Sequence, residues 1–290
     1  MTKQNHRQKI SKLLLGDLSF NRLIKSFLFI YCFIGLYLFF FADKLIFIPN
    51  NSSYSNSEYI LKLTTENNHQ IAALYLPNSE AKYTILYAHG NAEDLGDIEF
   101  RLQQLNQNGF SVLAYDYPGY GISTGQPTEK SVYLAIDAVY HYLTQELKIP
   151  ADKIIVYGRS VGGGSALELA ANHPVAGVIL ESTFTTPFRV VIPFPIFPFE
   201  KFDNVKKIQK INAPVLMMHG KQDHIIPIEQ SQKLFELAST PKLSFWVEAA
   251  DHNDLFDVAD QQYWEQLKAF INLVENNKNN SAIITETLMS

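Results

Sequence analysis

A serine, an aspartate and a histidine, in this order along the chain, have the residue types and settings of a nucleophilic catalytic site. Ser160 stands in the pattern Gly-Arg-Ser-Val-Gly, after a short apolar run at residues 154–157 and before a helix-forming stretch that opens on three glycines. A strand, a sharp turn and a helix with serine at the apex are typical of a nucleophile elbow, whose strained serine presents its hydroxyl above the sheet. Gly158 and Gly162 leave room for that turn. The pattern predicts Ser160 as the nucleophile.

The same five-residue pattern also surrounds Ser123, in Gly-Ile-Ser-Thr-Gly. This second serine follows Pro118-Gly119 and precedes Gln126-Pro127, so no helix can begin directly behind it. Because the pattern gains its meaning from a strand before it and a helix after it, we interpret Ser123 as part of a glycine-rich turn.

Two downstream residues can activate Ser160, which needs a base to accept its proton and an acid to orient that base. Asp223 is the predicted acid, because it lies just past the carboxyl end of an apolar strand, where α/β sheets place catalytic groups. Glu181, just past the preceding strand, is the best alternative acid. His252, in the loop after the last apolar strand, is the predicted base, and capping of the next helix is its alternative role.

The remaining histidines are less suitably placed to act as the base. His89 and His219 precede glycines at strand ends, and we expect their imidazoles to hydrogen-bond loop backbone. No metal-spaced cluster, phosphate-binding loop or dinucleotide fingerprint occurs in the sequence, so we expect neither a metal nor a cofactor. The other histidines lie in the basic leader, in a turn, in or at the end of a helix, and beside the candidate acid: His6, His69, His141, His173 and His224.

Acyl transfer also needs hydrogen-bond donors directed at the developing oxyanion. The backbone N–H of Val161, directly after the nucleophile, is one predicted donor. The second is the backbone N–H of Asn91, in the loop after the strand at residues 83–87.

The elements that must position these groups are apolar strands alternating with amphipathic helices. Helices are predicted at residues 93–109, at residues 128–150 and after Ser160, and a last one at residues 254–274. Apolar strands separated by helices indicate a parallel sheet with helices on both faces. The first two strands form a hairpin, and the predicted strands are residues 59–63, 69–76, 83–87, 110–115, 154–157, 175–180, 215–218 and 243–247.

Composition is compatible with one large α/β domain and an appendage. The chain has 290 residues, of which 47% are hydrophobic and 18% charged, so a sizeable core can form. The net charge of −5 argues against a nucleic-acid partner, which usually meets a clustered basic face. The single cysteine, Cys32, excludes an intramolecular disulfide and a cysteine-based zinc site.

An apolar run near the amino terminus predicts a membrane anchor at residues 23–42. Residues 26–42 carry no charge, and extension to Leu23, with Lys25 snorkelling, gives the roughly 20 residues that cross a bilayer. Residues 1–22 are basic, which predicts a cytoplasmic amino end and a catalytic domain on the non-cytoplasmic side, the periplasmic face in a bacterium. A cleaved signal peptide and a buried core helix are the alternatives.

The rest of the chain divides by composition. Residues 43–58 form a polar linker, residues 59–276 the catalytic domain and residues 277–290 a polar, frayed tail. Within the domain, residues 183–208 are rich in proline and phenylalanine, and four prolines there exclude a regular helix.

Five segments in sequence order resemble the α/β-hydrolase superfamily. More narrowly, they resemble its membrane-anchored abhydrolase-domain proteins, which include eukaryotic protein depalmitoylases and bacterial relatives. The resemblance covers about residues 45 to 275. It implies that Ser160, Asp223 and His252 form a triad carried by an eight-stranded sheet, and that residues 183–208 are a cap over the site. The segments are YAHGNAEDLG, YDYPGYGISTGQPTE, YGRSVGGGSALELA, HGKQDHIIP and ADHNDL.

Together these features predict a membrane-anchored serine hydrolase that cleaves carboxylic esters or thioesters of acyl chains. In the cap, Phe184, Phe188, Phe194 and Phe197 would offer an apolar wall to an acyl chain, or else simply cover the sheet. A serine peptidase on the same fold and a non-catalytic binding protein are the alternatives.

Overall fold

The chain divides into two compact units, residues 1–42 and residues 43–290. The computed structural model describes residues 20–289, with side chains described for residues 20–279. The basic segment predicted at residues 1–22 therefore lies almost entirely outside the described residues. The described part of the first unit, residues 20–42, belongs to helix α2 (Phe20–Ile46). In the described part of the chain, this helix is long and apolar enough to cross a membrane, with a mean hydropathy of 2.1.

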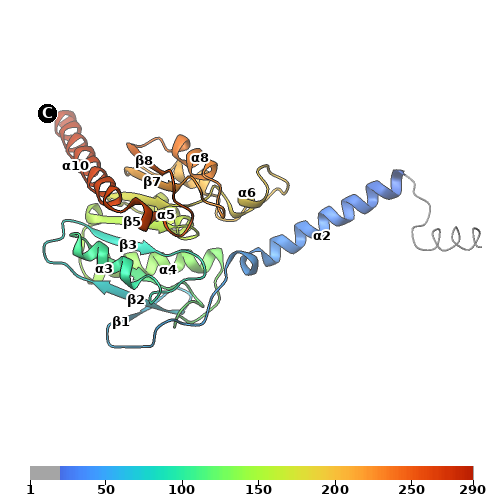
Figure 1. The fold of residues 1–290 in the computed structure, drawn as a ribbon, viewed down its shortest axis with the longest axis horizontal. Helices are drawn as coiled ribbons and strands as arrows, with labels where there is room; N and C mark the ends of the chain where they lie inside the picture. Colours follow the sequence, from blue (N-terminus) through green and yellow to red (C-terminus); the bar gives the residue numbers. More distant parts are fainter. Residues whose placement is uncertain (1–19, 290) are drawn as a thin grey trace, which may run out of the picture. The chain divides into compact units, whose positions relative to one another are not determined.

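An eight-stranded sheet forms the centre of the second unit, as the resemblance predicts (Figure 1). The strand order is β1-β2-β4-β3-β5-β6-β7-β8. Strand β2 runs antiparallel to both of its neighbours, and all the other pairs are parallel. The strands are β1 (Ile60–Thr64), β2 (Gln70–Leu76), β3 (Thr84–Ala88), β4 (Ser111–Tyr115), β5 (Ile154–Arg159), β6 (Gly177–Glu181), β7 (Val215–Gly220) and β8 (Lys242–Val247).

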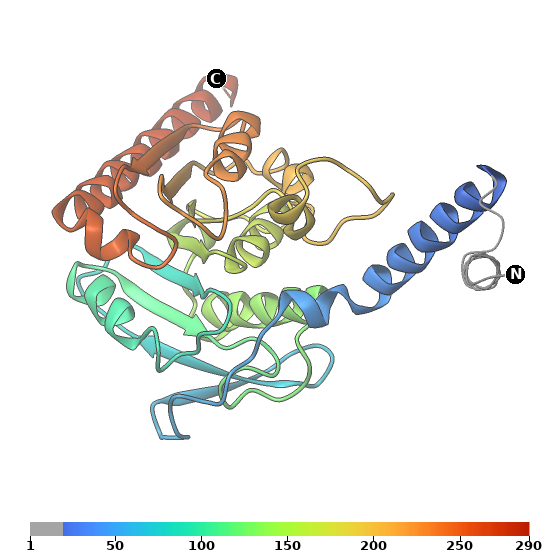
Figure 2. The same cartoon turned by 45° about the vertical axis from the view of Figure 1, so that its right-hand side comes forward.

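Helices cover both faces of the sheet because successive strand residues point to opposite sides. In β3, Leu86 packs in one hydrophobic core while Ile85 and Tyr87 pack in the other. One face is covered by α4 (Glu129–His141), α5 (Gly162–Asn172) and α8 (Glu229–Leu237), and the other by α3 (Glu99–Gln107), α9 (Leu255–Ala259) and α10 (Gln261–Met289). Figure 2 shows the same two layers around the sheet from a second direction.

Helix α4 begins as its sequence predicts and ends earlier. The side chain of Thr128 accepts a hydrogen bond from the backbone N–H of Ser131, whose hydroxyl accepts one from Thr128 in return. This capping box fixes the first turn. A π-helical turn at Tyr142–Glu146 then closes the segment before Pro150. The predicted helix over residues 128–150 is therefore shorter and ends in a widened turn.

The helix predicted from residue 93 begins only at Glu99. The carboxylate of Asp94 accepts hydrogen bonds from the backbone N–H groups of Gly96 and Asp97, and from the hydroxyl of Ser53. Side-chain bonds to nearby backbone compete with helix formation. The preceding loop is thus fixed by a contact with residue 53, which local periodicity cannot reveal.

The carboxyl-terminal helix also differs from its prediction. Asp260, with φ of 44°, separates α9 from α10. Helix α10 continues to Met289, so the frayed tail predicted at residues 277–290 is helical through that residue. An ion pair between Lys278 and Asp152 attaches the helix to the domain beyond residue 276.

The residues predicted as a linker at 43–58 are attached to the domain. Phe47 is 4% exposed and packs edge-on against Tyr117, Tyr120 and Phe202. Tyr54 donates a hydrogen bond to Asp116. The second unit accordingly begins at residue 43 rather than at residue 59.

The proline-rich segment contains two single-turn helices, α6 (Pro187–Val191) and α7 (Asn204–Ile208). The expectation that prolines exclude a regular helix is wrong at Pro187. Proline is tolerated at the first helical position because its missing N–H would have no helical partner there. Thr186 caps this helix by accepting a hydrogen bond from the N–H of Arg189.

Candidate functional site

Ser160 lies in a strained turn between β5 and α5. Its φ is 53°, in the left-handed region that non-glycine residues rarely adopt. A hydrogen bond of 2.8 Å from its N–H to the carbonyl oxygen of Glu181 holds the backbone in place. A Cβ on Gly158 would lie 2.6 Å from the carbonyl oxygen of Gly162, and one on Gly162 would lie 2.2 Å from that of Ala88. Both glycines are therefore required by the turn.

The structure brings the three predicted site residues together. The Nε2 atom of His252 lies 3.0 Å from the Oγ of Ser160, and its Nδ1 lies 2.7 Å from the Oδ2 of Asp223. When Nδ1–H donates to the carboxylate, Nε2 is left to accept the hydroxyl proton. Ser160 and His252 are buried in the free protein, with 7% and 6% of their surfaces exposed.

The carboxylate of Asp223 is held ionised by its hydrogen-bond donors. Burial alone would raise its pKa, but hydrogen bonds from His219 and His252 outweigh burial and hold the pKa well below its usual range. The backbone N–H groups of Ile225 and Ile226 also donate to Oδ1, at 2.9 and 2.7 Å. The result is a fixed negative charge beside the imidazole of His252.

His219 supports Asp223 in a way the sequence does not suggest. Its Nε2 lies 2.8 Å from the carbonyl oxygen of Ile226, the expected backbone contact, and 3.0 Å from Oδ2 of Asp223. Its Nδ1 lies 2.7 Å from the hydroxyl of Ser231. The sequence signal for this contact is the spacing of four residues between His219, near the end of β7, and Asp223 in the loop that follows.

Glu181, the alternative acid, belongs to a different cluster. Its buried carboxylate accepts a hydrogen bond of 2.8 Å from Arg101 and another from Tyr157, and Arg159 Nε lies 3.3 Å away. Burial would raise the pKa of Glu181, but the two arginines, Arg101 first, lower it below its usual value. The geometry thus pairs His252 with Asp223 and leaves Glu181 as the counter-ion of two arginines.

Arg159, the residue before Ser160, joins three loops around the site. Its Nη1 donates to both carboxylate oxygens of Glu93, at 2.9 and 2.8 Å. Its Nη2 donates to the carbonyl oxygen of His252 at 3.2 Å and to the side chain of Asn253 at 2.7 Å. Glu93 in turn accepts the backbone N–H of Gly90. Sequence reasoning missed this residue, although an arginine ending an apolar strand is itself a signal of buried pairing.

The two predicted oxyanion donors have free backbone N–H groups among the residues that the structure describes. Neither the N–H of Asn91 nor that of Val161 donates a hydrogen bond within the described chain. The side chain of Asn91 is used structurally, because Oδ1 accepts from Ile48 N–H and Tyr120 and Nδ2 donates to the carbonyl of Ile46. These bonds fix the loop and leave the backbone N–H of Asn91 available as a hydrogen-bond donor.

Ser123 and His89 have structural contacts, as expected from their positions. The hydroxyl of Ser123 accepts from Ala72 N–H at 2.9 Å and donates to the carbonyl of Asp116 at 3.2 Å. The Nδ1 of His89 lies 2.7 Å from the carbonyl of Gly90, and its Nε2 lies 3.4 Å from Asp116. Both residues thus fix loops at the ends of β3 and β4.

The four predicted cap phenylalanines differ in exposure and in the rings they contact. Phe184 is buried, 5% exposed, and its ring packs edge-on against Phe202. Phe188 and Phe197 both contact the ring of Phe199. Phe194 is 60% exposed.

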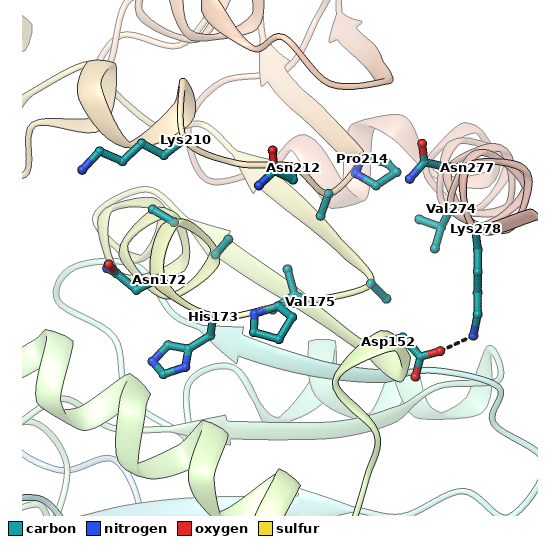
Figure 3. A pocket seen from close by; sticks show the side chains of 15 residues that line it. Asp152, Asn172, His173, Val175, Lys210, Asn212, Pro214, Val274, Asn277 and Lys278 are labelled. Carbon is teal, nitrogen blue, oxygen red and sulfur yellow. Dashed lines mark hydrogen bonds and ion pairs between the residues drawn. The ribbon is translucent and has the colours of Figure 1, made fainter. Parts of the chain in front are cut away.

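A cavity of about 490 Å³ lies at the amino ends of the parallel strands, whereas the candidate site lies at their carboxyl ends (Figure 3). Its lining includes His173, Asn212 and Lys278, and Lys278 pairs there with Asp152. Asp152 precedes β5 whereas Ser160 follows it, and a six-residue strand spans about 20 Å. The cavity is therefore separate from the candidate site. No group of three or more possible metal ligands occurs among the described residues.

The fold and the strand-end position of the site define the chain as an α/β hydrolase. The model of the serine aminopeptidase S33 family matches residues 79–198. The esterase Pf2001 of Pyrococcus furiosus has the same fold, with a TM-score of 0.65 at 19% identity, over 77% of this chain and 98% of that one. An esterase from Exiguobacterium antarcticum superimposes with a TM-score of 0.56 at 17% identity, over 73% of this chain and 98% of its own.

Sequence relatives narrow this class to one family. Alpha/beta hydrolase domain-containing protein 17B of Homo sapiens is 35% identical over 261 residues, which cover 79% of this chain and 90% of the relative. Protein 17C of Xenopus tropicalis is 37% identical over 194 residues, covering 66% of this chain and 62% of the relative. The chain belongs to this α/β-hydrolase domain-containing protein family and is a hydrolase.

Proposed function

We propose that the protein is a membrane-anchored serine hydrolase that cleaves carboxylic esters or thioesters of acyl chains. The observation that carries this proposal is the continuous series of contacts Asp223–His252–Ser160, with distances of 2.7 and 3.0 Å. An imidazole oriented by an ionised carboxylate and in hydrogen-bond contact with a serine is the arrangement that activates a hydroxyl for attack on an acyl carbon.

The first half of the reaction forms an acyl-enzyme. His252 Nε2 accepts the proton of Ser160 as Oγ bonds to the acyl carbon, and Asp223 stabilises the imidazolium that results. The free N–H groups of Asn91 and Val161 donate to the oxyanion. The imidazolium then gives its proton to the leaving alcohol or thiol as the bond to the acyl carbon breaks.

The second half releases the acid. His252 takes a proton from water, the hydroxide attacks the acyl carbon, and the same oxyanion donors act again. Collapse of this intermediate breaks the bond to Ser160, and the imidazolium returns the proton to Oγ. Neither half requires any group besides the substrate, water and these residues.

A serine peptidase is the second candidate, because the matching family model is described as a serine aminopeptidase. An aminopeptidase must bind the free ammonium group of its substrate, which calls for an unpaired carboxylate near the serine. Glu93 and Glu181, the carboxylates linked to the elbow through Arg159, are both neutralised by arginine. This pairing favours an uncharged acyl substrate.

Labelling with a fluorophosphonate probe, followed by a substrate panel, tests the proposal. Full-length protein and Ser123→Ala should react with the probe, whereas Ser160→Ala should not. Separate samples that have not met the probe should hydrolyse acyl esters and thioesters where the variant is one that labels, and should leave aminoacyl amides intact. Labelling of a folded Ser160→Ala variant, or hydrolysis of amides alone, would contradict the proposal.

Anchoring through α2 is the second part of the proposal, supported by the apolar helix and the basic residues before it. The amino end would then be cytoplasmic and the domain non-cytoplasmic, periplasmic in a bacterial host. The protein should resist extraction of membranes with alkaline carbonate, and an added protease should reach the domain only from the non-cytoplasmic side. Release by carbonate would rule out a spanning anchor.

A further inference from the structure

Residues 190–199, here called the apolar loop, form an uncharged segment between Arg189 and Glu200. Figure 2 shows this gold-coloured segment, which begins in the last turn of α6, projecting from the second unit. Val191 is 80% exposed and Phe194 is 60% exposed, and Pro193 and Pro195 beside them are exposed as well. A cluster of exposed apolar side chains on one loop is unusual for a surface that faces only water.

Polar contacts fix the neck of the apolar loop. Arg189 forms an ion pair with Glu200, whose other carboxylate oxygen accepts the hydroxyl of Thr186 at 2.8 Å. The guanidinium of Arg189 also donates to the carbonyl oxygens of Ile192 and Phe194. The loop is therefore held in one shape with its apolar tip exposed, and a pre-shaped surface binds with less ordering cost.

The neck of the loop lies where the polypeptide of α2 joins the domain. Lys201, next to Glu200, forms an ion pair of 3.0 Å with Asp43, and the ring of Phe202 packs 5.8 Å from that of Phe47. Asp43 is the first residue of the second unit and follows Ala42, the last residue of the apolar unit, by one peptide bond. Consecutive Cα atoms are 3.8 Å apart. If α2 spans a bilayer, the base of the apolar loop is thus held at the bilayer surface.

We infer that the apolar loop docks on a lipid bilayer, with Val191 and Phe194 inserted among the headgroups and upper acyl chains. This inference rests on the proposed anchoring by α2 and names the partner as the same membrane. Apolar and aromatic side chains without nearby charge gain most from that boundary region. Arg189 is already paired, so no unpaired charge from the neck opposes insertion.

Docking would also orient the candidate site. Thr183, the first residue of the cap, donates from its hydroxyl to the carbonyl oxygen of Ser160 at 2.9 Å. Gln230 accepts from Thr185 and donates to the carbonyl of Arg189 at 3.1 Å, which ties the neck to the body of the domain. A bilayer-bound loop would therefore hold Ser160 close to the membrane surface, where acyl chains of membrane lipids or lipidated molecules are available as substrates.

Depth-dependent fluorescence quenching tests the inference on the full-length chain. In a Cys32→Ser background, Val191→Cys and Phe194→Cys are labelled separately with an environment-sensitive fluorophore and reconstituted into phosphatidylcholine nanodiscs. Phe100→Cys is the matched control, because Phe100 is 65% exposed on α3, away from the cap. Circular dichroism spectra and thermal melts check that each labelled variant is folded.

We expect both loop labels to emit at shorter wavelength than the Phe100 label and to be quenched by spin-labelled lipid but not by aqueous iodide. Iodide quenching equal to that of the control would overturn the inference. So would shielding from both quenchers, which indicates a protein partner or a second copy. The measurement is repeated with Ser160→Ala, so loss of the proposed chemistry and loss of docking are distinguished.

Discussion

The guanidinium of Arg159 donates a hydrogen bond of 3.2 Å to the carbonyl oxygen of His252. The residue before the predicted nucleophile thus fixes the main chain of the predicted base, which lies 93 positions later. The same guanidinium binds Glu93, whose carboxylate accepts the backbone N–H of Gly90. One buried cation therefore links the turn at Ser160 to the loop that carries His252 and to the loop that carries Gly90 and Asn91.

Replacing Arg159 with methionine should lower kcat by about a hundredfold, because misplacing a reacting group by roughly 1 Å has an effect of that size. Arg159→Lys should recover part of the loss. Steady-state kinetics on a soluble ester measure the effect on kcat, and urea unfolding measures any effect on stability separately. Arg101→Met is the matched control, since Arg101 also pairs with Glu181 but has no contact with His252 among the described residues. Equal losses of kcat in Arg159→Met and Arg101→Met would show that Arg159 does not position His252.

Stability in acid should depend on Asp223. Its pKa is lower in the folded state than the value of about 3.9 in an unfolded chain, so its ionised form stabilises the fold. This stabilisation is complete above about pH 5 and is lost as the pH falls below about 4 towards the folded-state pKa. Urea unfolding at several pH values should show that the unfolding free energy falls less steeply with decreasing pH for Asp223→Asn than for the natural protein.

Asp260→Asn serves as the control for removing one carboxylate elsewhere. Asp260 is exposed and has a φ of 44°, which asparagine tolerates. The unfolding free energy of the Asp260→Asn variant should fall with decreasing pH as steeply as that of the natural protein. If Asp223→Asn unfolds with the same pH dependence as Asp260→Asn, the low pKa of Asp223 is refuted.

Gly162→Ala should disrupt the elbow. The new Cβ would lie 2.2 Å from the carbonyl oxygen of Ala88 and 2.6 Å from that of His89, and neither backbone atom can move aside cheaply. Overpacking of this kind costs about 1–3 kcal/mol, so we expect a lower unfolding free energy and loss of probe labelling. Gly109→Ala, where no atom lies within 4 Å but φ is +94°, should be strained yet retain labelling. A fully labelled Gly162→Ala variant would contradict this reading of the turn.

Most of the fold could be predicted because apolar runs report burial directly. Every end of the eight strands lies within two residues of the end of its predicted run, since strands buried on both faces leave a continuous apolar signal. The loop before α3 could not be predicted, because Asp94 is held by Ser53, a contact between residues 41 positions apart.

The candidate site could be predicted in part for a related reason. Ser160, Asp223 and His252 each follow an apolar strand, and the ends of parallel strands meet at one edge of a sheet. The support that Arg159 and His219 provide depends on side-chain directions that residue order does not encode. The burial of Phe184 against Phe202 could not be predicted either, because it depends on how the cap folds back.

Mapping of the covalent adduct tests whether Ser160 carries the acyl group. Full-length protein is treated with a fluorophosphonate, digested and analysed by tandem mass spectrometry, with His252→Ala treated in parallel. We expect one adduct, on Ser160, formed far more slowly in His252→Ala. An adduct on Ser123 would show that Ser160 is not the nucleophile, and an adduct on Ser160 that forms equally fast without His252 would show that His252 does not activate it.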